Sequence, residues 1–171
     1  MREMMEDVEF KDRVRVHTDG GCHGNPGPGA WAYVVELSSG TVEGSGYEPE
    51  TTNNRMELTA VIKALAFIRT TLEASAPGNS PQMQEPQMPE VEVHTDSRYV
   101  QQGISSWIDA WERNGWKTSA KKPVKNQELW RLLRALQLEL KPRWSWVRGH
   151  SGDPSNERCD ELVQIAIAAK N

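Results

Sequence analysis

Two short stretches of the chain are nearly identical and carry an acidic residue at the same place. Residues 14–20 read VRVHTDG and residues 91–97 read VEVHTDS, so Asp19 and Asp96 are equivalent and lie 77 positions apart. Each stretch alternates apolar and polar residues, which predicts a β-strand. Either aspartate alone is typical of a turn or a helix cap. If the strands lie parallel in matching register, however, the two carboxylates meet and repel unless a proton or cation lies between them, which favours a metal site.

Two further acidic residues border helix faces that we expect to pack on this sheet. Glu57 directly precedes an apolar stripe, and Asp160 follows Cys159 at the start of another. Each also has a structural interpretation: Asn54 and Glu57 have capping-box spacing, and Asp160 would lie in the first turn of a helix, where the macrodipole favours an acid. Four convergent carboxylates instead suit a pair of hard divalent ions, a geometry that serves phosphodiester cleavage.

The charge of the chain is unevenly distributed. Its 171 residues include 20 Lys and Arg against 24 Asp and Glu, a net charge of -4 that argues against a polyanionic partner. Residues 111–149, however, carry ten basic and three acidic residues, a net +7, which leaves -11 for the rest. Trp107, Trp111 and Trp116 flank or interrupt this basic segment, a combination that suits nucleic acid. The alternative is a solvated helix face whose tryptophans turn into the core.

Length and composition predict one globular domain. Cys22 and Cys159 are too few for a disulfide framework, and the first residues contain no apolar signal region. No apolar run approaches the roughly 20 residues needed to span a bilayer. We therefore expect a cytoplasmic monomer without a membrane role.

The elements that must position these residues alternate between strands and helices, which predicts an α/β fold. We expect a five-stranded mixed sheet, with a three-strand antiparallel meander and two parallel strands, flanked by helices. The predicted strands are 13–19, 30–37, 41–47, 91–96 and 143–147, and the predicted helices are 53–73, 97–103, 126–140 and 156–170. A further predicted helix begins at Ser106 and carries Trp107 and Trp111. Ser97, Ser106 and Asn126 are the expected helix caps.

The remaining segments complete the predicted organisation. Residues 20–29 contain five glycines and two prolines and predict a loop. Leu129, Leu132, Leu133, Leu136 and Leu140 form the expected buried stripe of the 126–140 helix. We expect a frayed tail at 1–12, a domain at 13–170, a flexible Pro-rich insertion at 76–90 and a basic protrusion at about 107–126.

Several of these motifs occur together in a known order. TDGGCHGNPGPG at 18–29, TNNRMEL at 52–58, TDSRYV at 95–100, GHSG at 149–152 and NERCDEL at 156–162 resemble the type 1 ribonuclease H family. Residues 115–126 resemble the basic protrusion of that family. The resemblance runs from about residue 14 to residue 168, and several long motifs in order are far more specific than one short pattern.

The resemblance implies an endoribonuclease that degrades the RNA strand of RNA/DNA hybrids and leaves 5′-phosphate and 3′-hydroxyl ends. It assigns two Mg²⁺ ions, with Mn²⁺ as a possible substitute, to Asp19, Glu57, Asp96 and Asp160. One ion would activate water while the other stabilises the departing 3′ oxygen. The resemblance also implies that His150 transfers a proton or assists product release, although a lone histidine before a loop is more often structural.

The resemblance further implies which residues bind the substrate. Sensing of the RNA 2′-hydroxyls points to Cys22, Gly24, Asn25, Asn53 and Asn54, with Arg98 nearby. Thr52 and Asn25 would contact phosphate, and the protrusion would hold the DNA strand through Trp107, Trp111, Trp116, Lys117, Lys121, Lys122 and Asn126. Such contacts carry no base information, so cleavage should be largely sequence-independent. Arg98 stands where related sequences commonly have glutamine, and Glu112 with Asn114 makes the protrusion less basic than many. These departures predict weaker or more salt-sensitive hybrid binding.

Three other functions fit parts of the sequence. A non-catalytic hybrid-binding module would lack at least one of the four carboxylates. An integrase or junction-resolving nuclease of the same broad fold would lack the glycine-rich segment and the Trp-Lys protrusion. A nucleotide-binding protein is suggested by residues 20–29, but the segment lacks the Gly-Lys-Ser/Thr ending of a P-loop.

Overall fold

The computed structural model describes residues 13–75, 88–148 and 152–170. Its centre is a mixed sheet in the order β3-β2-β1-β4-β5. The strands are β1 (Arg13–Cys22), β2 (Gly27–Leu37), β3 (Gly40–Thr51), β4 (Glu90–Thr95) and β5 (Arg143–Trp146). The first three form an antiparallel meander, and β4 and β5 run parallel to β1. The predicted fold class is confirmed.

The register between β1 and β4 follows the repeated sequence. Val16 pairs with Val93 and His17 pairs with His94, which is the same offset of 77 that separates Asp19 from Asp96. Residues that are paired across parallel strands point to the same face of the sheet. The register therefore brings the two aspartates to one end and one face of the sheet, as the repeat predicts.

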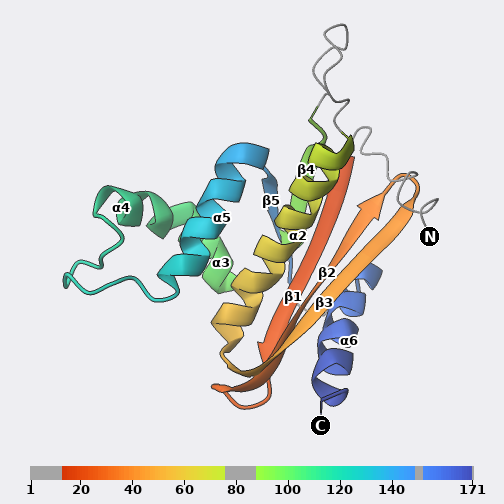
Figure 1. The fold of residues 1–171 in the computed structure, drawn as a ribbon, viewed down its shortest axis with the longest axis horizontal. Coiled ribbons are helices and arrows are strands. Elements are labelled where there is room, and N and C mark those ends of the chain that lie inside the picture. Colours follow the sequence, from red (N-terminus) through yellow and green to blue (C-terminus); the bar gives the residue numbers. More distant parts are fainter. Residues whose placement is uncertain (1–12, 76–87, 149–151, 171) are drawn as a thin grey trace, which may run out of the picture.

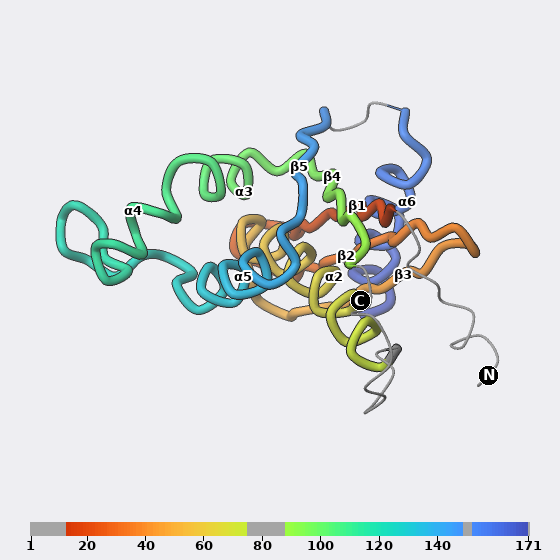
Figure 2. Tube along the Cα trace, turned by 90° about the horizontal axis from the view of Figure 1, so that it is seen from above, coloured from red at the N-terminus to blue at the C-terminus, as the bar shows by residue number. Residues whose placement is uncertain are grey.

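Helices cover both faces of the sheet (Figure 1). The long helix α2 (Asn53–Ser75) packs on β1 and β2, and α5 (Gln127–Leu140) packs against α2. Helix α6 (Pro154–Ala168) lies on the opposite face, against β1, β2 and β3. The view in Figure 2 shows α4 (Ile108–Arg113) and the following loop extending away from the sheet, as expected for a protrusion.

The main core lies between the sheet and α2. Val14 and Val16 of β1 pack with Leu58 and Leu65 of α2, and all four are almost fully buried. Trp130 of α5, which is 0% exposed, closes the outer side of this cluster. A smaller cluster of β2 and α6 residues fills the opposite face: Ala30, Ala32, Val163 and Ile167. The main cluster holds α2 against β1, and the smaller cluster holds α6 against β2.

The predicted loop at 20–29 is mostly strand. β1 continues to Cys22 and β2 begins at Gly27, so only four residues connect the two strands. The glycines serve close packing rather than a wide turn. A Cβ on Gly20 would lie 2.3 Å from the backbone carbon of Met56, so only glycine lets β1 pass this close to α2.

Helix ends and helix faces differ from the prediction in four places. Ser106 caps nothing, because α3 (Arg98–Gln102) continues through the π-helical segment η1 (Gly103–Trp107) into α4. Asn126 precedes α5 in a left-handed conformation, and its side chain does not cap the helix. Leu132, which the sequence pattern predicts to be buried, is 54% exposed, and Trp130 is buried in the core instead. Asp160 lies beyond the first turn of α6, because the helix begins at Pro154.

Ser97 does cap α3 as predicted: its hydroxyl accepts a hydrogen bond from the Val100 amide at 3.1 Å. Among the residues described, no helix combines the length and apolar character that crossing a membrane requires. The predicted tail at 1–12, residues 76–87 of the predicted insertion, and His150 lie outside the described residues.

Candidate active site: a carboxylate cluster beside a basic protrusion

Asp19 is the centre of an electrostatic cluster. Its pKa is raised from 3.8 to about 7, first by burial and then by the nearby negative charges of Asp96, Asp160 and Glu57, against a lowering hydrogen bond from Gly20. The four carboxylates therefore interact although they come from β1, α2, the end of β4 and α6. The structure brings together the four acidic residues that the sequence singled out.

Glu57 reaches the cluster because α2 packs unusually closely on β1. A Cβ on Gly20 would also lie 2.6 Å from the Glu57 amide nitrogen, so the backbone that follows Asp19 contacts the backbone that carries Glu57. The Glu57 carboxylate does not form the predicted capping box. Its Oε2 accepts a hydrogen bond of 2.7 Å from the Ser97 hydroxyl, while burial and the charge of Asp96 raise the pKa of Glu57.

Asp160 is held in place by its neighbour in α6. The Cys159 side chain is fully buried, and its Sγ donates a hydrogen bond to the His17 carbonyl oxygen at 3.3 Å. This contact joins α6 to β1 only two residues before Asp19. Burial strongly raises the pKa of the Cys159 thiol, so the group stays protonated and able to donate.

The donor set fits a hard divalent cation. Carboxylate oxygens are the ligands that Mg²⁺ prefers, and burial together with the neighbouring carboxylates raises the pKa of Asp19, an effect that a bound cation would oppose. Within the described ranges, however, no three His, Cys, Asp or Glu side chains form a ready-made metal-binding group. The side chains are gathered by the fold, and their final convergence on an ion is a proposal taken up below.

The end of β1 and the start of α2 are joined through the predicted substrate-binding residues. The Asn53 side-chain oxygen accepts hydrogen bonds from the Cys22 amide at 2.9 Å and from its thiol at 3.3 Å. The Asn25 side-chain oxygen accepts one from the Asn53 amide at 3.3 Å. Thr52, rather than Asn53 or Asn54, caps α2 by accepting from the Arg55 amide at 3.2 Å. Gly24 has a φ of 79°, which favours glycine.

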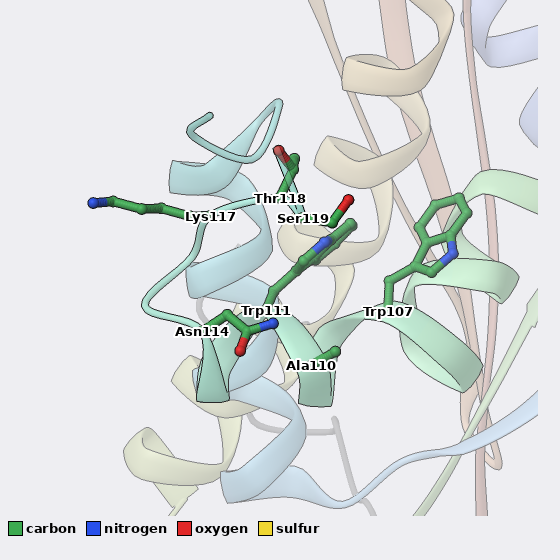
Figure 3. Close-up of a pocket in the computed structure, with 7 residues that line it drawn as sticks. All are labelled: Trp107, Ala110, Trp111, Asn114, Lys117, Thr118 and Ser119. Atoms are coloured by element: carbon green, nitrogen blue, oxygen red, sulfur yellow. The ribbon is translucent and has the colours of Figure 1, made fainter. Parts of the chain in front are cut away.

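A cleft opens on the protrusion (Figure 3). Trp107 and Trp111 form its aromatic side, with ring centroids 5.5 Å apart. The other residues that line it are Ala110, Asn114, Lys117, Thr118 and Ser119. Trp116 is different, because its side chain is only 8% exposed and the Arg131 guanidinium lies 5.3 Å from its ring. Trp116 therefore anchors the protrusion, and Trp107 and Trp111 offer the accessible aromatic surface.

Ion pairs divide the basic residues into two groups. Arg134 pairs with Asp109 and Glu112, and Arg143 pairs with Glu90. Four lysines of the protrusion are exposed and make no ion pair within the described part of the chain: Lys117, Lys121, Lys122 and Lys125. Arg98 is exposed as well. The protrusion and the region beside Asp96 thus both offer exposed positive charge to a polyanion.

The sequence interpretation missed Arg55, which connects the two halves of the site. Its Nη1 donates to the Asn126 side-chain oxygen at 3.0 Å and to Glu128 at 2.7 Å. Asn126 in turn donates to the Tyr99 hydroxyl at 3.2 Å, so the start of α2, α3 and the base of the protrusion are joined. A second cleft beside Arg98 is lined by residues that were also missed: Gln101, Gln102, Ser105 and Ser106. No spacing in the sequence indicates these contacts, because they join separate elements.

Comparisons with known proteins identify the family and the fold of the chain. The family described as RNase H matches residues 11–168. A ribonuclease H of Treponema denticola is 49% identical over 153 residues, covering 88% of this chain and 94% of that protein. The crystal structure of LC9-RNase H1, described as a type 1 RNase H with the type 2 active-site motif, is 30% identical with a TM-score of 0.72 and covers 94% of this chain and 74% of that one. LC11-RNase H1 in complex with RNA/DNA hybrid is 26% identical with a TM-score of 0.64, covering 92% and 98%.

Proposed function

The chain belongs to the type 1 ribonuclease H family and is an endoribonuclease acting on RNA/DNA hybrids, and we propose that it hydrolyses the RNA strand at the carboxylate cluster. The observation that carries this proposal is the environment of Asp19. Three other carboxylates surround a partly buried aspartate whose pKa is raised to about 7, which is a costly arrangement for a protein without a bound cation.

The residues that would hold Mg²⁺, or Mn²⁺ in its place, are Asp19, Glu57, Asp96 and Asp160. When bound, the ions would supply Lewis-acid stabilisation of charge on the phosphate and lower the pKa of the attacking water. That water would bond to phosphorus as the bond from phosphorus to the 3′ oxygen breaks, which would leave 5′-phosphate and 3′-hydroxyl ends. Asp19 would be ionised in that state, because a nearby cation reverses the effect of the other carboxylates on its pKa. The role of His150 in moving a proton or releasing product rests on the family resemblance alone.

The protrusion and the end of β1 would hold the hybrid on either side of the cluster. The exposed lysines and the Trp107–Trp111 surface suit the phosphates and sugars of the DNA strand. The residues around Asn53 present backbone and amide groups that suit 2′-hydroxyls, the feature that distinguishes RNA from DNA. None of these contacts requires a particular base, so we expect cleavage at many sequences.

The experiment that tests this function compares three duplexes of one sequence: RNA/DNA hybrid, RNA duplex and DNA duplex, each with and without Mg²⁺. The wild-type chain should cut only the RNA strand of the hybrid, and only with the metal. The Asp19→Asn variant should bind the hybrid but leave it intact. Hybrid cleavage by that variant at the wild-type rate, or wild-type cleavage without a divalent ion, would overturn the mechanism. Hybrid binding without cleavage by the wild type would indicate a non-catalytic module instead.

A further inference from the structure

Ser97 is buried between two of the four carboxylates and is used by neither the proposed chemistry nor the substrate contacts. It follows Asp96 directly in the chain, it is 3% exposed, and its hydroxyl lies 2.7 Å from Oε2 of Glu57. Glu57 belongs to α2, and Ser97 belongs to the turn between β4 and α3. The contact therefore joins two elements that each deliver one carboxylate to the cluster.

The Ser97 hydroxyl has a second hydrogen-bond partner in the helix that follows. The Val100 amide donates to the Ser97 hydroxyl oxygen at 3.1 Å, so this oxygen is already an acceptor. A hydroxyl has a single proton, and the one acceptor opposite it is the Glu57 carboxylate. The Ser97 hydroxyl donates this proton to Oε2 of Glu57, which orients the carboxylate toward the donor.

The backbone of Ser97 is equally constrained. Its amide donates to the Thr95 hydroxyl at 3.1 Å, and its carbonyl accepts from the Gln101 amide at 3.0 Å. Because these bonds fix the position of Ser97, its hydrogen bond to Glu57 restrains the Glu57 carboxylate. A fixed donor of this kind restricts the rotamers of the glutamate before an ion arrives, which lowers the cost of ordering the ligand.

We propose that Ser97 is a positioning residue that holds the Glu57 carboxylate in its metal-binding orientation and sets its place relative to Asp96. The proposal rests on the function proposed above, and it goes further by assigning metal affinity to a residue that is not itself a ligand. Partners that orient metal ligands typically change metal affinity by about 10- to 100-fold when they are removed.

Three variants separate this role from helix capping. Ser97→Gly removes the donor to Glu57 but costs the helix cap only a few tenths of a kcal/mol, because glycine is a tolerated cap residue. Ser97→Thr retains a hydroxyl that can both donate and cap. Thr59→Val is the matched control: it removes a buried hydroxyl from the same helix as Glu57, where the group donates to the Arg55 carbonyl and does not contact a carboxylate.

The readout is the dissociation constant for Mg²⁺, measured by calorimetry on the full chain without substrate, well below the unfolding temperature. Ser97→Gly should weaken binding about tenfold or more, Ser97→Thr should stay within about threefold of the wild type, and Thr59→Val should leave the constant unchanged. A folded Ser97→Gly protein that binds Mg²⁺ as tightly as the wild type would overturn the proposal. Equal weakening in the Thr59→Val protein would do the same, because the effect would then be general destabilisation.

Should the glycine variant fail to fold, Ser97→Cys replaces it, since a thiol of similar shape is a weak donor and the same loss is expected. A different result is expected if the proposed function itself is wrong. A wild-type chain that binds no Mg²⁺ or cuts no hybrid contradicts the proposed function, whereas a wild type that does both, beside an unaffected Ser97 variant, contradicts only the role of Ser97.

Discussion

The imidazole rings of His17 and His94 stack on each other, with centroids 4.8 Å apart and planes inclined by 16°. These histidines are register partners in β1 and β4, and each lies two residues before one of the two aspartates. His17 is 3% exposed and lies between Glu36, 3.4 Å from its Nε2, and Asp153, 4.0 Å from its Nδ1. The stack therefore packs polar rings beneath the carboxylate cluster and close to the cap of α6.

We predict that His17 makes the protein less stable in mild acid. Burial lowers its pKa below 6.5, although Glu36 and Asp153 oppose this shift. As the pH falls through 6.5, the unfolded chain takes up the proton before the folded protein does, so the free energy of unfolding decreases. His17→Phe removes this effect. Urea unfolding at about pH 7.5 and about pH 5 should show the variant gaining stability relative to the wild type at the lower pH.

The control for that comparison is His23→Ala, which changes an exposed imidazole. A gain of stability at the lower pH that is as large in this variant would show that burial of His17 is not the cause. A constant difference between His17→Phe and the wild type would contradict the prediction.

Asp19→Asn should abolish hybrid cleavage and yet stabilise the metal-free protein at pH 8. The folded-state pKa of about 7 lies above the ordinary 3.8, so ionisation of Asp19 costs stability progressively above pH 3.8, and the full cost is present above pH 7. The variant should gain roughly 1 to 3 kcal/mol at pH 8 and almost nothing near pH 4. Thermal unfolding in chelator measures this gain, and Mg²⁺ should then raise the midpoint of the wild type more than that of the variant. Destabilisation of the variant at pH 8 would refute the electrostatic interpretation.

Gly20→Ala should damage both stability and activity, because the new Cβ would lie 2.3 Å from the backbone of Met56 in α2. Overpacking of this kind costs about 1 to 3 kcal/mol and would push Glu57 away from Asp19. Gly21→Ala is a closely matched control, since the nearest atom to its Cβ would be the Asn53 side-chain oxygen at 3.7 Å. Urea unfolding and hybrid cleavage should show lower stability and lower activity in Gly20→Ala than in Gly21→Ala. Equal stability and activity of the two variants would exclude the close approach of β1 and α2 as the cause.

The unpaired lysines should account for the salt dependence of hybrid binding. Each phosphate contact contributes about 0.9 to the slope of log affinity against log salt, so replacing Lys117, Lys121 and Lys122 together by alanine should reduce the slope by about two to three. Arg134→Ala should change it little, because Asp109 and Glu112 already pair with that guanidinium. Binding is measured in the Asp19→Asn background without Mg²⁺ so that the hybrid stays intact. An equal loss of slope in both variants would contradict the division of the basic residues into paired and available groups.

Much of the fold and of the carboxylate set follows from local patterns in the sequence. The alternation in residues 14–20 and 91–97 predicts two strands, and their common offset predicts the register that the structure has. Glu57 and Asp160 are predicted because each borders an apolar stripe, and helical periodicity determines which residues of a stripe face the core. These features depend on neighbours within a few residues, so the sequence by itself determines them.

Other features depend on contacts between distant elements, and only the tertiary structure decides them. The glycines after Asp19 are interpreted as a loop from the sequence, but Gly20 and Gly21 form strand because they pair with β2. Trp116 reads as a surface aromatic, but it is buried beneath Arg131. The hydrogen bond from Ser97 to Glu57 joins residues 40 positions apart, and no periodicity encodes it. Local spacing therefore identifies which side chains can do the chemistry, whereas their orientation and protonation are set by packing between elements, which becomes defined only when the chain is folded.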